Sequence, residues 1–566
     1  MKETLWNNKY KILIYALFWT LASTVGKVIY ETGNLSNLWK QPGTFGLFAI
    51  RMLVAGVLLL ALATLAQLFL TKYYLRRQAA KKTQELDPEK EKKKKRLYFV
   101  VLLLLYFGLS VICYLAYYPG IFSYDAPDQV HQIFGSWYSN YQPLVHTLFF
   151  EFCIKVEGLV GIHPLGLILY VMIQSLIVAA VEAYIAASLP GRPGIGLYYL
   201  LIPTFALFSI VFAKDVLFGS LLMLWTFLFW RWNGNRKAGW VVLILMGAVV
   251  GLLRNNMVYA FGVMLLVALV VRKKKHAILL TTIILLLELV LKVVYPLAGV
   301  MPTSEREKLS VPIVQMMSIY ENADSGMEEA DREAFRAYFM YEPSYNPRFA
   351  DPMKNVFDNA YYLKHKTEFW QLYGKYFTKM PTTFLSKFLD LNINFWYPFE
   401  SIMDPYGTKY YVETYTISLE EYPITNDHSE SLLPELLPFY EGFFLGDGEF
   451  MNSGVMASYF RLSFPFWIMV LCLFWTHLGE KRKLLIWSVY AGLMLTYFLG
   501  PVSNYRYLYP FYLAMPMLVV ICILPEREKT KASSLNRSQI AEEAAVKEDS
   551  VDTKEIEWSI EKGNET

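Results

Sequence analysis

Four short stretches of the sequence place acids and cations next to long apolar runs. A carboxylate in such a position can act as a general base or hold a divalent cation, and Arg or Lys can bind phosphate oxygens. The candidates are Asp125 and Asp128 in FSYDAPDQVHQIFG, Lys214 and Asp215 in VFAKDVLFG, Arg254 and Asn255 in LLRNNM, and Arg506 and Tyr507 in NYRYLYP; His146, in YQPLVHTL, is a further one. Together these side chains suit chemistry on a lipid-linked phosphate.

Each stretch also has a purely structural interpretation. An aspartate pair in a polar loop after an apolar run is commonly a turn or a helix cap. Lys214 beside Asp215 can form a local ion pair, and an arginine can extend toward lipid head groups. His146 can be a packed side chain of an amphipathic helix. The chemical interpretation therefore requires that the separate stretches meet in space.

The composition indicates a multi-pass membrane protein. The 566 residues are 55% hydrophobic and 16% aromatic, and apolar runs long enough to cross a bilayer core of about 30 Å recur along the chain. The basic residues gather in short clusters between these runs, which favours a role in orientation and not a nucleic-acid surface. The four cysteines lie singly in apolar stretches, without metal-ligand spacing. We expect an all-α integral membrane protein of the plasma membrane, in contact with the lipid bilayer.

The distribution of positive charge predicts twelve spans with both chain ends in the cytoplasm. Residues 72–96 hold eleven Lys and Arg against four acids, so this loop should be cytoplasmic. The span that follows then runs outward and places Asp125 on the external face. If residues 143–162 lie in the outer interface, the clusters RWNGNRK and RKKKH also fall inside. The predicted spans are 11–30, 45–70, 98–118, 164–188, 196–213, 215–231, 238–252, 256–271, 277–297, 459–478, 484–500 and 508–525.

This topology divides the chain into five parts. Residues 1–97 hold two spans and a basic loop, and residues 98–297 form a transmembrane core with the first external acidic loop. Residues 298–458 form a long external segment, mostly helical and rich in aromatic residues, with a second interfacial or spanning stretch at 376–399. Residues 459–525 return to the membrane, and the polar tail 526–566 should be disordered and cytoplasmic. All four polar stretches then lie on the external side.

The pattern resembles the GT-C superfamily of integral-membrane glycosyltransferases. YYPGIFSYDAPDQ matches its first-loop acidic motif, YQPLVHTL its juxtamembrane element, and VFAKDVLFG its later hairpin aspartate. Two features depart from that pattern: the acids are spaced Asp-x-x-Asp without an adjacent Glu, and Gln142-Pro143-Leu144 only echoes the His-Pro-Pro element. Over roughly residues 98–525 the chain also looks like an uncharacterised family of bacterial multi-pass membrane proteins, a likeness that supplies no activity.

The GT-C resemblance implies an inverting hexosyltransferase. It would move a sugar from a polyprenyl-phosphate donor to a cell-envelope glycan or polymer, such as wall polysaccharide, on the external face. The resemblance implies that the catalytic carboxylates are Asp125, Asp128 and Asp215, with Asp125 as the base and with Mg²⁺ or Mn²⁺ as a cation that the three could hold. The donor phosphate would bind Lys214, Arg254 and Arg506, and the substrate would contact His146, Asn255 and Tyr507.

Three other classes fit part of the pattern. Twelve spans with both ends inside is a common plan for a transporter or flippase, but the sequence has no repeat between halves and no paired broken helices. A polysaccharide polymerase or ligase would use a similar donor, with Arg254 and Arg506 at its centre in place of Asp125. A non-catalytic scaffold would not explain charged residues at several hairpin tips.

Overall fold

The computed structural model describes residues 8–83, 88–122, 125–190, 192–232, 234–400, 431–444, 458–476 and 480–524. Within these ranges every regular element is a helix, and only four isolated β-bridges occur. The all-α expectation is therefore confirmed for the part of the chain that is described. The predicted tail at 526–566 lies outside the described residues.

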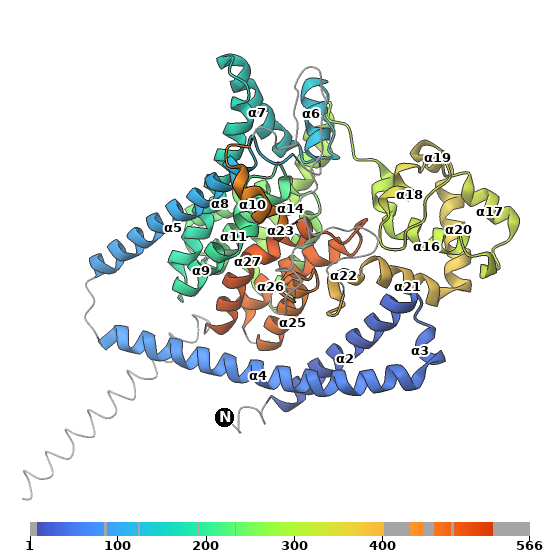
Figure 1. The fold of residues 1–566 in the computed structure, drawn as a ribbon, viewed down its shortest axis with the longest axis horizontal. Helices are drawn as coiled ribbons and strands as arrows, with labels where there is room; N and C mark the ends of the chain where they lie inside the picture. The colour runs from blue at the N-terminus through green and yellow to red at the C-terminus, as the bar shows by residue number, and fades with distance from the viewer. Residues whose placement is uncertain are drawn as a thin grey trace, which may run out of the picture.

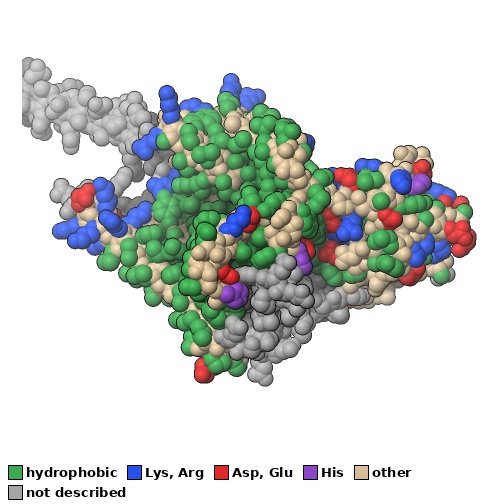
Figure 2. All heavy atoms as spheres, turned by 90° about the horizontal axis from the view of Figure 1, so that it is seen from above, with side chains coloured by type: hydrophobic (Ala, Val, Ile, Leu, Met, Phe, Trp, Pro, Cys, Tyr) green, Lys and Arg blue, Asp and Glu red, His purple; other side chains and the backbone are tan. Residues whose placement is uncertain are grey.

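Six helices are long and apolar enough to cross a membrane. They are α2 (Lys9–Thr32), α4 (Pro42–Thr83), α5 (Pro88–Ala116), α8 (Leu165–Ser188), the stretch from α14 (Lys274–Leu289) through α15 to Leu297, and α27 (Tyr505–Ile523). Such helices indicate a membrane protein in contact with the bilayer. Their outer surfaces are apolar, and Figure 2 shows hydrophobic side chains covering much of the helical bundle.

The other six predicted spans are helical but shorter or more charged, so the total of twelve stays a prediction. Four correspond to α11 (Lys214–Arg231), α12 (Lys237–Leu253), α13 (Met257–Val270) and α26 (Lys481–Tyr497), and a fifth to the short α25 (Phe464–Trp475). The segment 196–213, expected as one helix, is two: α9 (Arg192–Leu201) and α10 (Pro203–Ser209). The break follows from Pro203, because the residue before a proline, Ile202, takes an extended conformation.

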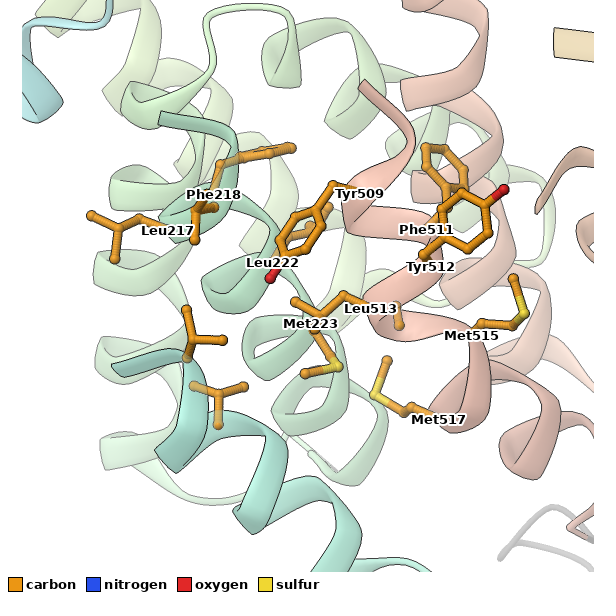
Figure 3. Packing of buried hydrophobic residues seen from close by; sticks show 14 of the residues in the cluster. Leu217, Phe218, Leu222, Met223, Tyr509, Phe511, Tyr512, Leu513, Met515 and Met517 are labelled. Atoms are coloured by element: carbon orange, nitrogen blue, oxygen red, sulfur yellow. The ribbon is translucent and has the colours of Figure 1, made fainter. Parts of the chain in front are cut away.

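The bundle packs around one large apolar core. Its members come mainly from α5, α8, α11, α13, α26 and α27. Figure 3 shows Leu222 and Met223 of α11 beside Tyr509 and Leu513 of α27. The close approach of these two helices requires Gly219, where a Cβ atom would lie 3.2 Å from the Cα of Pro510. The packing of α11 against α27 matters for the site because each helix carries in its first turn a cation that takes part in the site.

Two interfacial candidates are resolved as short helices. The stretch 143–162 forms α7 (Leu144–Val160), which packs against α8 and α12. Its outer face carries the exposed apolar residues Leu148, Phe152 and Leu159 together with Lys155, whereas His146 and Glu151 are buried. The stretch 376–399 contains the end of α20 (Lys366–Lys379), then α21 (Pro381–Leu391) and α22 (Ile393–Trp396). Neither α21 nor α22 is long enough to cross a bilayer.

Residues 305–396, which we call the helical module, form a second unit with its own core. It contains α16 (Ser310–Tyr320), α17 (Glu329–Arg336), α18 (Asp351–Asn355), α19 (Asn359–Lys364), α20 (Lys366–Lys379), α21 and α22. Its core includes Ile313, Phe335, Phe357 and Phe369. Figure 1 shows the module beside the bundle, and Figure 2 shows mixed charges on its surface.

Candidate functional site

A small piece of parallel pairing brings two of the polar stretches together. The backbone N–H of Ile121 donates to the Ile210 carbonyl at 3.3 Å, and the N–H of Phe212 donates to the Ile121 carbonyl at 3.0 Å. Asp125 lies four residues after Ile121 in the sequence, and Lys214, two residues after Phe212, is the first residue of α11. The pairing therefore sets the two side chains within reach of each other.

Asp125 is held by two cations. It occupies the N-cap position of α6 (Ala126–Phe134), yet its side chain caps no backbone N–H. Instead, Oδ2 lies 2.7 Å from Nζ of Lys214 and 3.2 Å from Nη1 of Arg506. Burial would raise the pKa of the Asp125 carboxyl, but Arg506 and Lys214 hold that pKa well below its usual value. Asp125 is therefore an anion at neutral pH and does not serve as a cap.

A second, fully buried ion pair adjoins the first. Arg254, in the turn between α12 and α13, pairs with Asp215 of α11. The guanidinium also lies 4.6 Å from the ring of Tyr497 and 5.1 Å from the ring of Tyr507. Oδ2 of Asp215 and Nε of Arg254 have no hydrogen-bond partner among the described residues. Buried polar atoms of this kind normally find a partner in the protein, in ordered water or in a ligand.

Tyr507 joins the two ion pairs. Its hydroxyl accepts a hydrogen bond from Nη2 of Arg506 at 3.2 Å, and its ring lies 5.0 Å from the same guanidinium. Arg506 is placed by the first turn of α27, where the side chain of Asn504 accepts the Arg506 backbone N–H at 3.0 Å. Three cations, Lys214, Arg254 and Arg506, thus surround two carboxylates. The predicted convergence of separate polar stretches is present, and we call these five residues with Tyr507 the cation cluster.

Asp128 lies at the exposed edge of the cation cluster. Its pKa is raised, first by partial burial and then by the charge of Asp125, although a hydrogen bond with Gln142 opposes the shift. Gln142 also accepts from Nζ of Lys214 at 2.6 Å. Sequence reasoning did not select Gln142 as a site residue. Its position in the Gln142-Pro143-Leu144 element was the signal that could have identified it.

His146 lies behind the cluster and does not hydrogen-bond to it. Its Nδ1 is 3.0 Å from Oε1 of Gln129, and its Nε2 is 2.7 Å from the Tyr170 hydroxyl. The Tyr170 hydroxyl also lies 2.9 Å from Oε1 of Gln174, and Nε2 of Gln174 donates to the carbonyls of Ser209 and Val211. Burial and the charge of Lys214 lower the pKa of His146 to about 3, so the imidazole is neutral. This buried network holds the backbone near Val211, where the bridge with Ile121 precedes Lys214. In the sequence, only the glutamines within the helices indicated such a network.

Asn255 joins two loops at the site. Its Nδ2 donates to both the carbonyl and the side-chain oxygen of Asn140, at 3.2 and 3.1 Å. Thr303 donates to the same Asn140 carbonyl at 2.9 Å. Asn255 thus ties the Arg254 turn to the loop before α7, and its Oδ1 has no hydrogen-bond partner among the described residues.

The three carboxylates do not fit a divalent-cation site in this arrangement. Asp125 and Asp215 each use an oxygen on a Lys or Arg side chain. Over the described ranges, no group of three His, Cys, Asp or Glu side chains lies close enough to hold a metal ion. Three cations at one place instead suit an anion with several oxygens, such as a phosphate.

A family model described as a family of unknown function, DUF6020, matches residues 135–537. The match includes Lys214, Asp215, Arg254 and Arg506, whereas Asp125 and Asp128 precede it. No curated protein and no solved structure matches the chain.

Proposed function

Since this chain belongs to the DUF6020 family of unknown function, we propose its activity from the cation cluster: it is a GT-C-type glycosyltransferase. The donor is a sugar on polyprenyl phosphate, and the acceptor is a hydroxyl of a cell-envelope glycan on the external face of the plasma membrane. The observation that carries this proposal is the ionised Asp125 carboxylate between Lys214 and Arg506, beside the buried Asp215–Arg254 pair.

Binding of the donor would make the Asp125 carboxylate a stronger base. A phosphate that enters the cluster competes with Asp125 for Lys214 and Arg506, because Lys and Arg side chains donate charge-assisted hydrogen bonds to phosphate oxygens as well as to carboxylates. As the cations move to the phosphate, the pKa of Asp125 rises from its lowered value toward that of a useful base. Proton abstraction is then tied to the presence of donor.

The proposed reaction is a single displacement. The acceptor hydroxyl attacks the anomeric carbon of the donor sugar while its proton passes to Asp125. The bond between that carbon and the phosphate oxygen breaks, and the phosphate leaves with the electron pair. Arg506, Arg254 and Lys214 stabilise the growing charge on the leaving phosphate, and the anomeric configuration is inverted.

The first test is Asp125→Asn in purified protein with a set of polyprenyl-phosphate hexoses. Loss of a general base should lower kcat by about 10²- to 10⁴-fold, measured as release of polyprenyl phosphate. Glu329→Gln is the control, because this acid is solvent-exposed on α17. If the Asp125→Asn variant turns over at the wild-type rate, the role of Asp125 as the general base is refuted.

An arginine-centred polymerase or ligase is the second candidate. The observation that favours it is that Arg254 and Arg506 both lie against the Tyr507 ring. The base mechanism predicts that Asp125→Asn lowers kcat far more than Arg254→Lys does, because lysine keeps a positive charge beside the leaving phosphate. If Arg254→Lys abolishes turnover and Asp125→Asn leaves it nearly unchanged, the ligase proposal replaces the transferase.

We propose that the reaction requires no divalent cation, since three protein cations already face the phosphate position. Activity should be unchanged after dialysis against EDTA and should not increase when Mg²⁺ or Mn²⁺ is added back. A loss that either metal restores would return Asp125, Asp128 and Asp215 to the metal-binding role.

The proposal also requires the cation cluster to face outward. The four native cysteines are buried, so single cysteines can be introduced with little background. Tyr341→Cys, exposed on the helical module, should react with an impermeant maleimide on intact cells. Lys93→Cys, exposed near the start of α5, should react only after the cells are opened. The reverse pattern would place the site in the cytoplasm.

A further inference from the structure

A second group of cations lies at the opposite end of the helices from the cation cluster. Helix α11 begins with Lys214 of that cluster and ends at Arg231, about 25 Å away along the helix axis at roughly 1.5 Å per residue. Arg192 is the first residue of α9, and Lys95 lies two turns into α5. We call Lys95, Arg192 and Arg231 the basic triad.

Three helices bring the basic triad together. Nη2 of Arg192 lies 3.0 Å from Oε1 of Glu91, and the Arg192 carbonyl accepts a hydrogen bond from the Tyr98 hydroxyl at 2.7 Å. Glu91 and Tyr98 lie four residues before and three residues after Lys95, so all three share one face of α5. The start of α9 is therefore held against the face that carries Lys95. The charges of Arg231 and Arg192 both act on Lys95 and repel it.

Lys95 differs from the other basic residues at the start of α5. Lys93, Lys94 and Arg96 are exposed, as expected for a solvated segment that orients a membrane span. Lys95 is partly buried. Among the described residues, the one acid that offsets the repulsion on Lys95 is Glu91, and this acid is already paired with Arg192. Three cations therefore face one carboxylate, and an anion with several oxygens would balance the excess charge.

The basic triad lies where the membrane meets water. Trp232 directly follows Arg231 at the end of α11 and packs against Trp240 of α12, with 4.8 Å between the ring centroids. Tryptophan and tyrosine are enriched at this level of membrane proteins. The Arg231 guanidinium lies 5.4 Å from the ring of Phe227, one turn back toward the middle of the helix. The side chain thus stays beside the apolar surface of α11, at the depth of lipid phosphates.

We propose that the basic triad binds the phosphate headgroup of an anionic phospholipid, in the leaflet opposite the cation cluster. The inference does not depend on the proposed function. Phosphatidylglycerol has the required chemistry, since its phosphate carries one net negative charge. Phosphatidylcholine has the same phosphate but no net charge, and it offers less to a site with excess positive charge. The bound lipid would connect the ends of α5, α9 and α11.

The test measures lipid binding to the full chain by native mass spectrometry from detergent, with phosphatidylglycerol and phosphatidylcholine as probes. Lys95→Gln and Arg231→Gln each remove one charge from the basic triad. Lys94→Gln and Arg236→Gln are the matched controls, because each removes one charge at an exposed position outside the triad. Lys95→Arg keeps the charge. Inorganic phosphate in excess serves as a competitor that has no lipid chains.

We expect wild type to bind phosphatidylglycerol more tightly than phosphatidylcholine. Each triad Gln variant should weaken phosphatidylglycerol binding by about fivefold or more, whereas Lys94→Gln, Arg236→Gln and Lys95→Arg should stay within about twofold of wild type. Equal losses in triad and control variants would overturn the inference, as would an equal affinity of wild type for both lipids. Displacement of phosphatidylglycerol by inorganic phosphate would assign the site to a free anion and overturn it as well.

Thermal unfolding gives a second readout. Because a ligand stabilises the folded state that binds it, phosphatidylglycerol should raise the Tm of wild type and of Lys94→Gln, and raise that of Lys95→Gln much less. Without anionic lipid, Lys95→Gln should unfold no earlier than wild type, since it removes a repelling charge. An equal rise in Tm for all three proteins would contradict a specific site.

Discussion

At the scale of single residues, chemistry at this site depends on which partner each charge has. Asp125 occupies the N-cap position of α6, yet its carboxylate pairs with Lys214 and Arg506 and does not cap the helix. A capping aspartate would be worth about 1 kcal/mol to α6. The strong pairing with cations in a partly buried position outweighs that gain and keeps the carboxylate in the cation cluster.

His146 makes stability depend on pH in a defined direction. Its pKa of about 3 in the folded protein lies below the value of about 6.5 in an unfolded chain. Between these values the unfolded state binds one more proton, so the free energy of unfolding falls as pH falls. At pH 5 the expected loss from this residue is about 2 kcal/mol. Burial is the main cause of the lowered pKa of His146. The charge of Lys214 lowers this pKa further, and the charge of Asp125 raises it.

His146→Gln should therefore flatten the pH dependence of stability. The apparent Tm of detergent-purified wild type should drop between pH 7 and pH 5, and the drop should be smaller in the variant. Gln can still hydrogen-bond but does not titrate. If the apparent Tm of both proteins falls equally between pH 7 and pH 5, His146 is not held neutral in the folded protein.

At the scale of elements, the bridge between residues 121 and 211 places both the base and its cation. Gly120 precedes this bridge with a φ of +120°, a conformation that other residues rarely adopt. A Cβ atom at this position would also lie 2.7 Å from Cε2 of Phe212. The stretch after α5 can therefore take its path only with glycine at position 120.

Gly120→Ala should destabilise the protein by about 1–3 kcal/mol and lower activity by disturbing the contact between Asp125 and Lys214. The control is Gly108→Ala in α5, where an added Cβ meets nothing within 4 Å and helix propensity favours alanine. Thermal unfolding of both variants checks the prediction, and equal Tm values would contradict it.

At the scale of the whole molecule, several hydrogen bonds tie the helical module to the bundle, and two of them lie near α2 and the start of α27. Arg348 pairs with Asp390 at 2.9 Å and donates to the Tyr30 carbonyl of α2 at 3.1 Å. The Ala350 N–H donates to the Pro501 carbonyl at 2.8 Å, in the loop just before Arg506. The position of the module is thus coupled to the start of α27 and to the cation cluster.

Asp390→Ala should be costly, because it leaves the buried Arg348 cation without its carboxylate. The expected loss is about 3–5 kcal/mol, and the double variant Arg348→Met with Asp390→Leu should recover much of it. Glu342→Ala is the control, since its pair with Arg336 is solvent-exposed and worth at most about 1 kcal/mol. Thermal unfolding measures all three. Equal losses for the buried and exposed variants would show that the Arg348–Asp390 pair contributes no more than a surface pair.

The sequence by itself determined the helical membrane class and the chemistry available to the site. Both are local properties: apolar runs indicate spans by their length, and charged residues beside them are costly unless they are used. The alternating direction of the predicted spans also predicted that Asp125, Lys214, Arg254 and Arg506 lie on the same side of the membrane. The break at Pro203 was likewise visible as a residue type, although the span was predicted as continuous.

Only the tertiary structure decided which charges pair. Asp125 meets Arg506 across 381 residues of chain, and it does so because the packing of α11 on α27 and the bridge at Ile121 set their relative positions. The network from His146 through Tyr170 to the Val211 carbonyl depends on the same packing. Such contacts join residues that are far apart in the sequence, and no local sequence pattern specifies which of these residues meet.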